Sequence, residues 1–473
     1  MNALAIGVAN VLLTVTGAGA LAVIGFARSR RDLVRMAGVA WLAGMAVAGI
    51  AGAILTPLGA HVSWLLVILP TAGGAAAVWR LTGERIPGTT PPARAASITS
   101  RAAAALLAGA TASLGIVALW ALSGAPLEEY DGWAMWGMKA HALAALGTAD
   151  PDVFASAAYF PAHLEYPLAI PFLSSLPLVV AGTFDSNVVV IQGFLTGVAG
   201  IAGIWFLLRD RVRPVVLWAW LAAIVATPAV AGQLGTGYAD VQLALFVAVG
   251  LVCLARWAED GRRPMLALGA VFLAAAALSK NEGALFAAAA ILSTLVVAKG
   301  RRRSVLVCGA FVLGMLIPWH VWTTTIDIPR GSDYDLGSSF DPGYVLGRLG
   351  RIRLTYEWFW RRVLFSGDWK PLPLIAIATV TAGLTVRRSQ AAVLAALFSV
   401  LSVAGLTWIY LISPLGVDDF LDSNGTRVVA SVVLGVAALG PLIVDDLIGR
   451  PAPATSSGTL STRPGQRPQP ESS

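Results

Sequence analysis

Long apolar segments alternate with short polar connections along the whole chain. The apolar runs are about 17–24 residues long, which is the length that an α-helix needs to cross a bilayer. They fall near residues 3–26, 37–57, 62–79, 102–122, 186–208, 214–231, 239–256, 264–279, 283–298, 304–324, 371–386, 390–412 and 427–447. The pattern predicts an all-α polytopic membrane protein with about 13 transmembrane helices.

The charges of the connecting loops predict which side of the membrane each loop faces. The loop Arg28–Arg35 carries four arginines and one aspartate, the loop Arg80–Arg101 is also basic, and the connection 58–61 is uncharged. Basic residues collect in short cytoplasmic loops. The amino terminus and the acidic loop after Leu122 are therefore expected outside. Because Arg28 follows the first apolar run rather than preceding it, we expect that run to be a membrane span and not a cleaved signal peptide.

Two segments are expected to lie at the outer membrane surface without crossing. If 167–182 crossed, the basic loops that follow it would all move to the outer side, which opposes the positive-inside rule. Its prolines at 167, 171 and 177 also disfavour a straight spanning helix. Residues Arg348–Leu364 mix arginine with large apolar side chains, as an interfacial amphipathic helix does. These are the predicted outer-face juxtamembrane helices.

The composition supports a membrane protein and argues against nucleic-acid binding. Of 473 residues, 57% are hydrophobic and only 12% are charged, against roughly 25% charged in soluble domains. The net charge of +7 follows from the basic inner loops, and no basic-aromatic motif accompanies it. Cys253 and Cys308 lie in apolar runs and are expected to be core residues. The tail Pro451–Ser473 is rich in Pro, Ser, Thr and Gly, so we expect it to be disordered in the cytoplasm.

The segment Leu127–His141 holds the densest candidate chemistry. Glu128, Glu129 and Asp131 follow the apolar run that ends near Leu122. Two close carboxylates suit binding of a divalent metal such as Mg or Mn, or removal of a proton by a general base. The alternative is an acidic outer loop whose carboxylates merely favour the start of a helix.

A helix is predicted over 131–147, directly after these acids. Trp133, Trp136, Ala140 and Leu143 would lie on one face, suited to the membrane interface. Lys139 would bind an anionic substrate or snorkel to lipid headgroups. His141 is a further candidate on the same helix.

Four more charged residues interrupt apolar sequence at predicted outer helix ends. Lys280 and Glu282 lie in the turn Ser279–Gly283, where a tight reversal explains the asparagine and glycine but not the charges. Asp240 opens a span and is either functional or an N-cap. Arg427 opens the last span and suits a phosphate clamp. Charge at outer ends with apolar span centres favours chemistry at the outer interface.

These motifs resemble the GT-C superfamily of integral-membrane glycosyltransferases, especially its protein O-mannosyltransferase and aminoarabinose-transferase groups. The resemblance covers about 115–447, so the first three spans lie outside it. It rests on Glu129-Tyr130-Asp131 with Trp133, Trp136 and Lys139-Ala140, then Glu165-Tyr166-Pro167-Leu168, Tyr238-Ala239-Asp240, Leu278-Ser279-Lys280-Asn281-Glu282-Gly283 and Arg427. Many relatives begin the first loop with adjacent Asp-Glu, which leaves open whether Glu128, Glu129 or Asp131 is the essential acid.

The resemblance implies transfer of a sugar from a polyprenyl-phosphate carrier to a glycan, lipid or protein acceptor, with inversion, on the extracytoplasmic face of the cell membrane. Asp131 would be the general base, and Glu129 would assist it or bind a metal. The donor phosphate would bind Lys280, Arg427 and Lys139. Substrate contacts would come from Asp240, Tyr166, Trp133, Trp136, His141 and Glu282. Segments 167–182 and 345–365 would shape a groove for the lipid chain.

This implies three regions: extra helices and a basic loop over 1–101, the catalytic membrane region over 102–449, and the tail over 450–473. The alternative enzyme is a glycan polymerase or ligase that uses a lipid-diphosphate donor. A transporter or flippase would need midplane charges or inverted repeats, and the sequence shows neither. A non-catalytic scaffold would tolerate replacement of Asp131.

Overall fold

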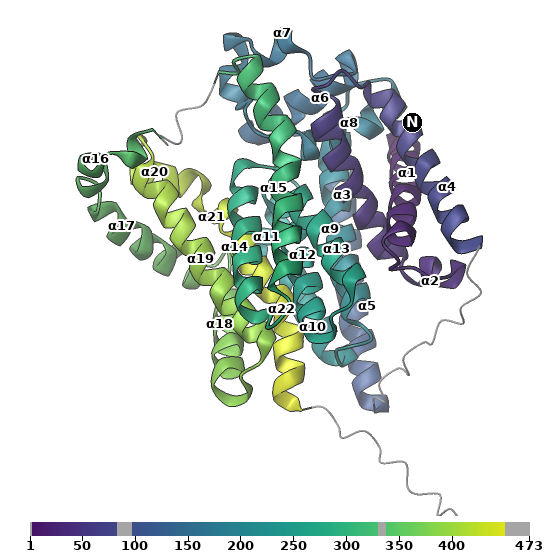
Figure 1. The fold of residues 1–473 in the computed structure, drawn as a ribbon, viewed down its shortest axis with the longest axis vertical. Coiled ribbons are helices and arrows are strands. Elements are labelled where there is room, and N and C mark those ends of the chain that lie inside the picture. The colour runs from purple at the N-terminus through teal and green to yellow at the C-terminus, as the bar shows by residue number, and fades with distance from the viewer. Residues whose placement is uncertain (1, 83–96, 330–336, 450–473) are drawn as a thin grey trace, which may run out of the picture.

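The computed structural model describes residues 2–82, 97–329 and 337–449, and these residues contain helices and no strands (Figure 1). Nine helical stretches within them are long and apolar enough to cross a membrane. They are α1 (Asn2–Val23), α3 (Ala37–Leu55), α4 (Val62–Thr82), α5 (Ile98–Leu122), α9 (Ser186–Leu208), α12 (Asp240–Asp260), α15 (Arg302–Thr325), α19 (Gln390–Ile412) and the stretch Val417–Ile448. The all-α polytopic architecture is therefore confirmed.

Shorter helices complete the bundle. The apolar ones are α8 (Ala169–Ala181), α10 (Pro214–Val225), α13 (Arg263–Ala277), α14 (Asn281–Val297) and α18 (Leu372–Ala382). The remaining elements are α2 (Arg30–Arg35), α6 (Met138–Leu146), α7 (Pro151–Phe154), α11 (Pro228–Gln233), α16 (Pro342–Leu346), α17 (Gly350–Trp358), α20 (Val417–Phe420), α21 (Thr426–Val428), α22 (Ala430–Ile448), and the 3-10 or π segments η1 (Gly132–Gly137), η2 (Ala157–Ala162), η3 (Ser338–Phe340), η4 (Phe359–Leu364), η5 (Gly383–Arg387) and η6 (Leu421–Gly425). The number of membrane crossings stays a prediction.

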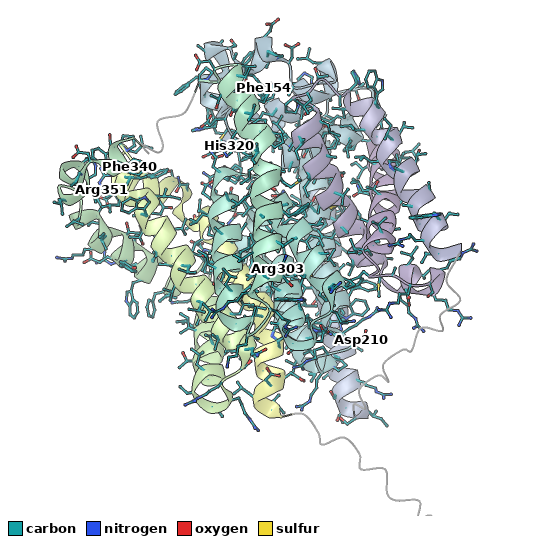
Figure 2. The ribbon with its side chains drawn as sticks, viewed as in Figure 1. Phe154, Asp210, Arg303, His320, Phe340 and Arg351 are labelled. Atoms are coloured by element: carbon teal, nitrogen blue, oxygen red, sulfur yellow. The ribbon has the colours of Figure 1, made fainter. Side chains whose placement is uncertain are left out.

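The basic loops meet at one end of the bundle. Arg209 donates to the Arg35 carbonyl at 2.8 Å, which joins two of these loops. Arg301 donates to the Ala258 carbonyl at 2.7 Å and joins two more. Figure 2 shows Asp210 toward this lower end of the bundle and Phe154 at the opposite end. This arrangement agrees with the prediction from loop charge, which assigned the basic loops to one side of the membrane and the acidic loop to the other.

Arg211 holds several helix ends together at the lower end. Its guanidinium contacts Glu259 at 2.9 Å, Asp445 at 3.0 Å and Asp446 at 2.7 Å. Burial disfavours the charge, but Glu259 and Asp446 outweigh this effect and raise the pKa of Arg211. The Asp445 side chain is fully buried. The contact therefore anchors the ends of α12 and α22 to the loop between α9 and α10.

Helix α8 forms within the segment 167–182, which was expected to stay on the outer side. Its first amide, of Ala169, donates to the Leu278 carbonyl at 3.0 Å, and its last turn leads to Asp185, which accepts a hydrogen bond from Asn2 at the start of α1. Thirteen residues rise about 20 Å, which is short of the roughly 30 Å hydrocarbon core. Ten of these residues are buried, so α8 inserts among α1, α3 and α9 rather than covering their surface.

The three N-terminal long helices pack tightly onto the rest of the bundle. A Cβ at Gly17 would stand 1.8 Å from the Ala40 carbonyl oxygen, so the glycine permits close contact of α1 with α3. Asn10 donates to Gln192 on α9 at 2.9 Å. The described part of the predicted 1–101 region is therefore continuous with the bundle. The predictions for the loop 83–96 and the tail 450–473 lie outside the described residues.

Two further predicted helices also form. The helix predicted over 131–147 is present as η1 and α6 over 132–146, and the interfacial helix predicted over 348–364 is present as α17 and η4 over 350–364. Arg351 of α17 donates to the Ser413 carbonyl at 2.6 Å, which fixes this segment to the end of α19. Figure 1 shows α16 and α17 beside the upper part of α19.

Candidate active site

A polar cavity of about 300 Å³ lies where α12 and α14 begin. Its charged lining consists of Asp131, Asp240, Lys280, Glu282 and Arg427. Aromatic, amide and imidazole side chains complete much of the wall, among them Trp136, His163, Tyr166, Tyr238, Phe420 and Asn424. Five charged residues, which the sequence predicted as site candidates on four separate segments, thus line one cavity.

Lys280 is held between two carboxylates. Its Nζ lies 2.9 Å from Asp240 Oδ1 and 3.3 Å from Glu282 Oε1, and all three side chains are more than nine-tenths buried. Gly283 permits the tight reversal, because a Cβ there would lie 1.9 Å from the Ala276 carbonyl oxygen. Asp240 Oδ2 is buried and has no hydrogen-bond partner among the described residues. An unpaired buried oxygen is costly, and a substrate hydroxyl at this point would satisfy it.

Arg427 connects the acidic first loop to the last span. Its Nη1 donates to Asp131 Oδ2 at 2.6 Å, and its guanidinium carbon lies 4.4 Å from the centre of the Tyr238 ring. Tyr238 in turn donates to Glu129 Oε2 at 3.0 Å. Burial raises the pKa of Tyr238, and Glu129 adds to this rise while Arg427 opposes it, so the phenol keeps its proton. Asp131 and Glu129 are therefore held by different partners.

The floor of the cavity is an aromatic pair above a buried lysine. Trp136 and Tyr166 stack with ring centroids 5.9 Å apart. Lys139 is fully buried, lies 5.1 Å and 5.4 Å from these two ring centres, and donates to the His163 carbonyl at 2.6 Å. Burial lowers the pKa of Lys139 to about 7, against the attraction of Glu165. Lys139 supports the floor and is not part of the cavity lining.

Two predicted substrate residues lie away from the cavity. Trp133 is 52% exposed and packs edge-on against Tyr130, and His141 is exposed and contacts Phe184 with the two rings tilted by 56°. The predicted common face of Trp133 and Trp136 does not form, because residues 132–137 are π-helical. A π-helix hydrogen-bonds five residues apart, which changes the direction of each side chain relative to an α-helix.

Several lining residues were not predicted from the sequence. His163 is bound to Glu165 at 3.2 Å and stacks on Tyr166 with ring centroids 5.3 Å apart. A histidine two positions before the Glu165 motif is a weak signal on its own. Phe420 and Asn424 reach the cavity only because η6 and the preceding turn fold back over it. No local pattern in the sequence predicts that this segment folds back over the cavity.

An apolar cavity of about 260 Å³ lies beside the polar one. Its walls come from α17, η4, α18, α19 and α22, and include Phe359 and Val433. The Tyr410 ring contacts a residue of each wall: its centroid lies 6.5 Å from that of Phe359, which lines the apolar cavity, and 5.2 Å from that of Phe420, which lines the polar one. The segment 345–365, which was expected to shape a lipid groove, thus contributes to an apolar cavity next to the charged site.

The predicted metal site is only partly matched by the side chains present. Within the described ranges, there is no group of three or more His, Cys, Asp or Glu side chains that could hold a metal ion. Glu129 and Asp131 already accept hydrogen bonds from Tyr238 and Arg427. A Mg or Mn ion at these two carboxylates would have to compete with both contacts. Metal binding by Glu129 and Asp131 stays a prediction.

The fold and the cavity define a class: a multi-pass helical membrane protein with a charged site at its helix ends and an apolar cavity beside that site. Residues 165–322 match the family model of dolichyl-phosphate-mannose-protein mannosyltransferases. The match supports a membrane glycosyltransferase of the GT-C superfamily, as the sequence resemblance implied. It includes Asp240 and Lys280, whereas Asp131 and Arg427 lie outside it. No curated protein and no solved structure matches the chain significantly.

Proposed function

We propose that this protein transfers a sugar from a polyprenyl-phosphate donor to an acceptor hydroxyl on the extracytoplasmic side, with Asp131 as the general base and inversion at the sugar. The observation that carries the proposal is the convergence of Asp131, Asp240 and Glu282 with Lys280 and Arg427 in one cavity. Such a site offers a base for the acceptor and cations for the phosphate that leaves. The family match supports the glycosyltransferase chemistry.

The two cavities suit the two parts of a polyprenyl-phosphate sugar. The apolar cavity would take isoprene units, and the polar cavity would take the phosphate and the sugar. Arg427 lines the polar cavity, and Val429, two residues further along the chain, lines the apolar one. A phosphate at Arg427 would therefore place its lipid chain beside the valines of α22.

The pair Arg427–Asp131 suggests how donor binding prepares the base. Phosphate binds guanidinium groups well because two N–H groups can donate to two phosphate oxygens. A donor phosphate that draws Arg427 away would free Asp131 to accept the proton of the acceptor hydroxyl. The acceptor oxygen then attacks the anomeric carbon, and the electron pair of the breaking carbon–oxygen bond goes to the phosphate. Lys280 and Arg427 stabilise the charge that develops there.

The other charged residues have supporting roles in this scheme. Asp240 and Glu282 hold Lys280 in place, and the unpaired Asp240 oxygen would accept a hydrogen bond from a sugar or acceptor hydroxyl. Glu129 would assist through its contact with Tyr238. The proposed sidedness follows from the basic loops, which gather at the end of the bundle away from the cavity and are expected to face the cytoplasm.

The test is sugar transfer in membranes supplied with radiolabelled polyprenyl-phosphate sugars. Asp131→Asn should lower the rate by about 10²–10⁴-fold, the usual contribution of a general base. Asp152→Asn is the matched control, because Asp152 is an exposed acid on the same outer segment. Equal rates for the native protein and Asp131→Asn would remove Asp131 as the base. Transfer from polyprenyl diphosphates alone would favour the polymerase or ligase, and lipid movement without bond formation a flippase.

A further inference from the structure

The polar cavity holds more negative than positive fixed charge. Asp131, Asp240 and Glu282 line it against only Lys280 and Arg427. Both cations already contact carboxylates, at distances of 2.6–3.3 Å. A donor phosphate adds a negative charge to this surplus, and that charge grows as the sugar leaves. A further positive group would therefore favour the binding of an anion in this partly buried site.

His163 is the one other side chain in the described cavity lining that gains positive charge near neutral pH. Its ring is oriented by two contacts: Nδ1 lies 3.2 Å from Glu165 Oε1, and its face stacks on Tyr166 with an interplanar angle of 13°. Its backbone is left-handed, with φ at 46°, and its carbonyl accepts the Lys139 hydrogen bond. A non-glycine residue in this conformation is strained unless its surroundings hold it. The surrounding contacts therefore fix His163 at the cavity wall.

Charged groups of both signs surround His163, and Glu165 is in contact with its ring. Burial alone would raise the pKa of Glu165, but the hydrogen bond from His163 and nearby positive charge hold it below its ordinary value. Glu165 is thus an ionised partner for an imidazolium. Burial lowers the pKa of Lys139 to about 7, so below that pH Lys139 is charged and opposes the imidazolium. The other charged groups around the cavity are Asp131, Asp240 and Glu282, which favour the imidazolium, and Lys280 and Arg427, which oppose it.

We propose that His163 is a third cationic residue of the donor phosphate site and that Glu165 is its positioning residue. The inference rests on the proposed function, which it deepens by assigning another group to the donor. The imidazolium donates an N–H hydrogen bond to a phosphate oxygen and retains its proton throughout. Its role is to offset the surplus of carboxylates while Lys280 stays close to Asp240 and Glu282.

The test measures binding of a polyprenyl methyl phosphodiester to the purified full-length protein in detergent. The single charge of this probe does not change with pH in the range used, so any pH dependence comes from the protein. Binding is followed through tryptophan fluorescence, to which Trp136 in the cavity floor contributes. The native affinity should rise about tenfold from about pH 8.5 to about pH 5.5, as expected for a gained charge-assisted hydrogen bond.

Four variants separate the roles. His163→Gln should bind as weakly at low pH as the native protein binds at high pH. His163→Lys, which keeps the charge, should bind about equally at both ends of the range. Glu165→Gln should move the midpoint of the pH dependence to lower pH, because the carboxylate no longer favours the imidazolium. His320→Gln is the matched control, since His320 is an exposed residue of α15 outside the cavity lining and should behave as native.

The outcomes distinguish this inference from the proposed function. If His163→Gln binds with the native affinity and pH dependence while Lys280→Gln loses binding, the donor site stands and the role of His163 is refuted. If the native protein does not bind the probe at any pH, both proposals fail together. Should His163→Gln be misfolded, Glu165→Gln decides the matter, and an unchanged midpoint would overturn the inference.

Discussion

Replacing the buried Lys139 with methionine should stabilise the protein at neutral pH. Lys139 is fully buried, and its pKa falls from 10.5 to about 7. At about 1.4 kcal/mol per pKa unit, keeping this lysine charged below pH 7 costs about 5 kcal/mol. Methionine loses the hydrogen bond to the His163 carbonyl and two ring contacts, together worth about 2 kcal/mol. The expected net gain for Lys139→Met is about 3 kcal/mol.

The stability difference between Lys139→Met and the native protein should depend on pH, in a direction that follows from the lowered pKa of Lys139. Between pH 7 and pH 10.5 the unfolded chain holds a proton on Lys139 that the folded chain has largely released. The unfolded state then binds more protons, so the stability of the native protein rises with pH across this window. Below pH 7 the penalty is complete and constant. The difference in stability between Lys139→Met and the native protein should therefore be largest at neutral pH and shrink toward pH 10.5.

The assay is thermal unfolding of the purified protein in detergent, followed by tryptophan fluorescence at several pH values. Lys299→Met is the matched control, because Lys299 is exposed, and its difference from native should not vary with pH. A Lys139→Met variant that unfolds at a lower temperature at neutral pH would contradict the reasoning. So would a difference from native that stays constant up to high pH, since burial would then not be what sets the protonation of this lysine.

Three further predictions concern other parts of the molecule. Arg211→Leu removes the guanidinium that contacts Glu259, Asp445 and Asp446, leaves Asp445 with Arg213 at 3.7 Å, and should lower stability by about 3–5 kcal/mol in denaturant unfolding; a loss under about 1 kcal/mol would show that Arg213 and solvent compensate these carboxylates. If Glu129 and Asp131 bind Mg or Mn, EDTA should abolish sugar transfer and added metal should restore it. Transfer that persists in EDTA would refute the metal site. Val433→Trp fills the apolar cavity and should raise KM for long-chain donors about tenfold while sparing donors with one or two isoprene units; equal effects on both would place the lipid elsewhere.

Tertiary structure alone decides how the charged residues pair. Arg427 contacts Asp131 across 296 positions of the chain, and Lys280 contacts Asp240 across 40. No local pattern predicts such pairs, since they depend on which helix ends the packed bundle brings together. They matter for the proposed mechanism, in which Asp131 parts from Arg427 before it takes up the proton of the acceptor.

The positions of Lys139, Trp133 and His163 likewise could be known only from the tertiary structure. Lys139 was predicted to bind phosphate, and the structure buries it beneath the cavity floor. The π-helical turn in η1 turns Trp133 away from the site, and hydrogen bonding five residues apart leaves no clear signal in an apolar sequence. His163 reaches the cavity wall through a left-handed backbone that Lys139 and Glu165 support from distant and neighbouring positions.

The class of this protein, its helices and most of the residues of its charged site can be predicted from the sequence alone. The length of an apolar run is a local property, and a bilayer converts it directly into a spanning helix. Charged residues in apolar surroundings are costly, so Asp240, Lys280 and Glu282 stood out as functional candidates before any contact was known. The shape of the cavity, the partner of each charge and the protonation of the buried groups came only from packing. Those properties depend on distance and burial between segments that are far apart in the chain.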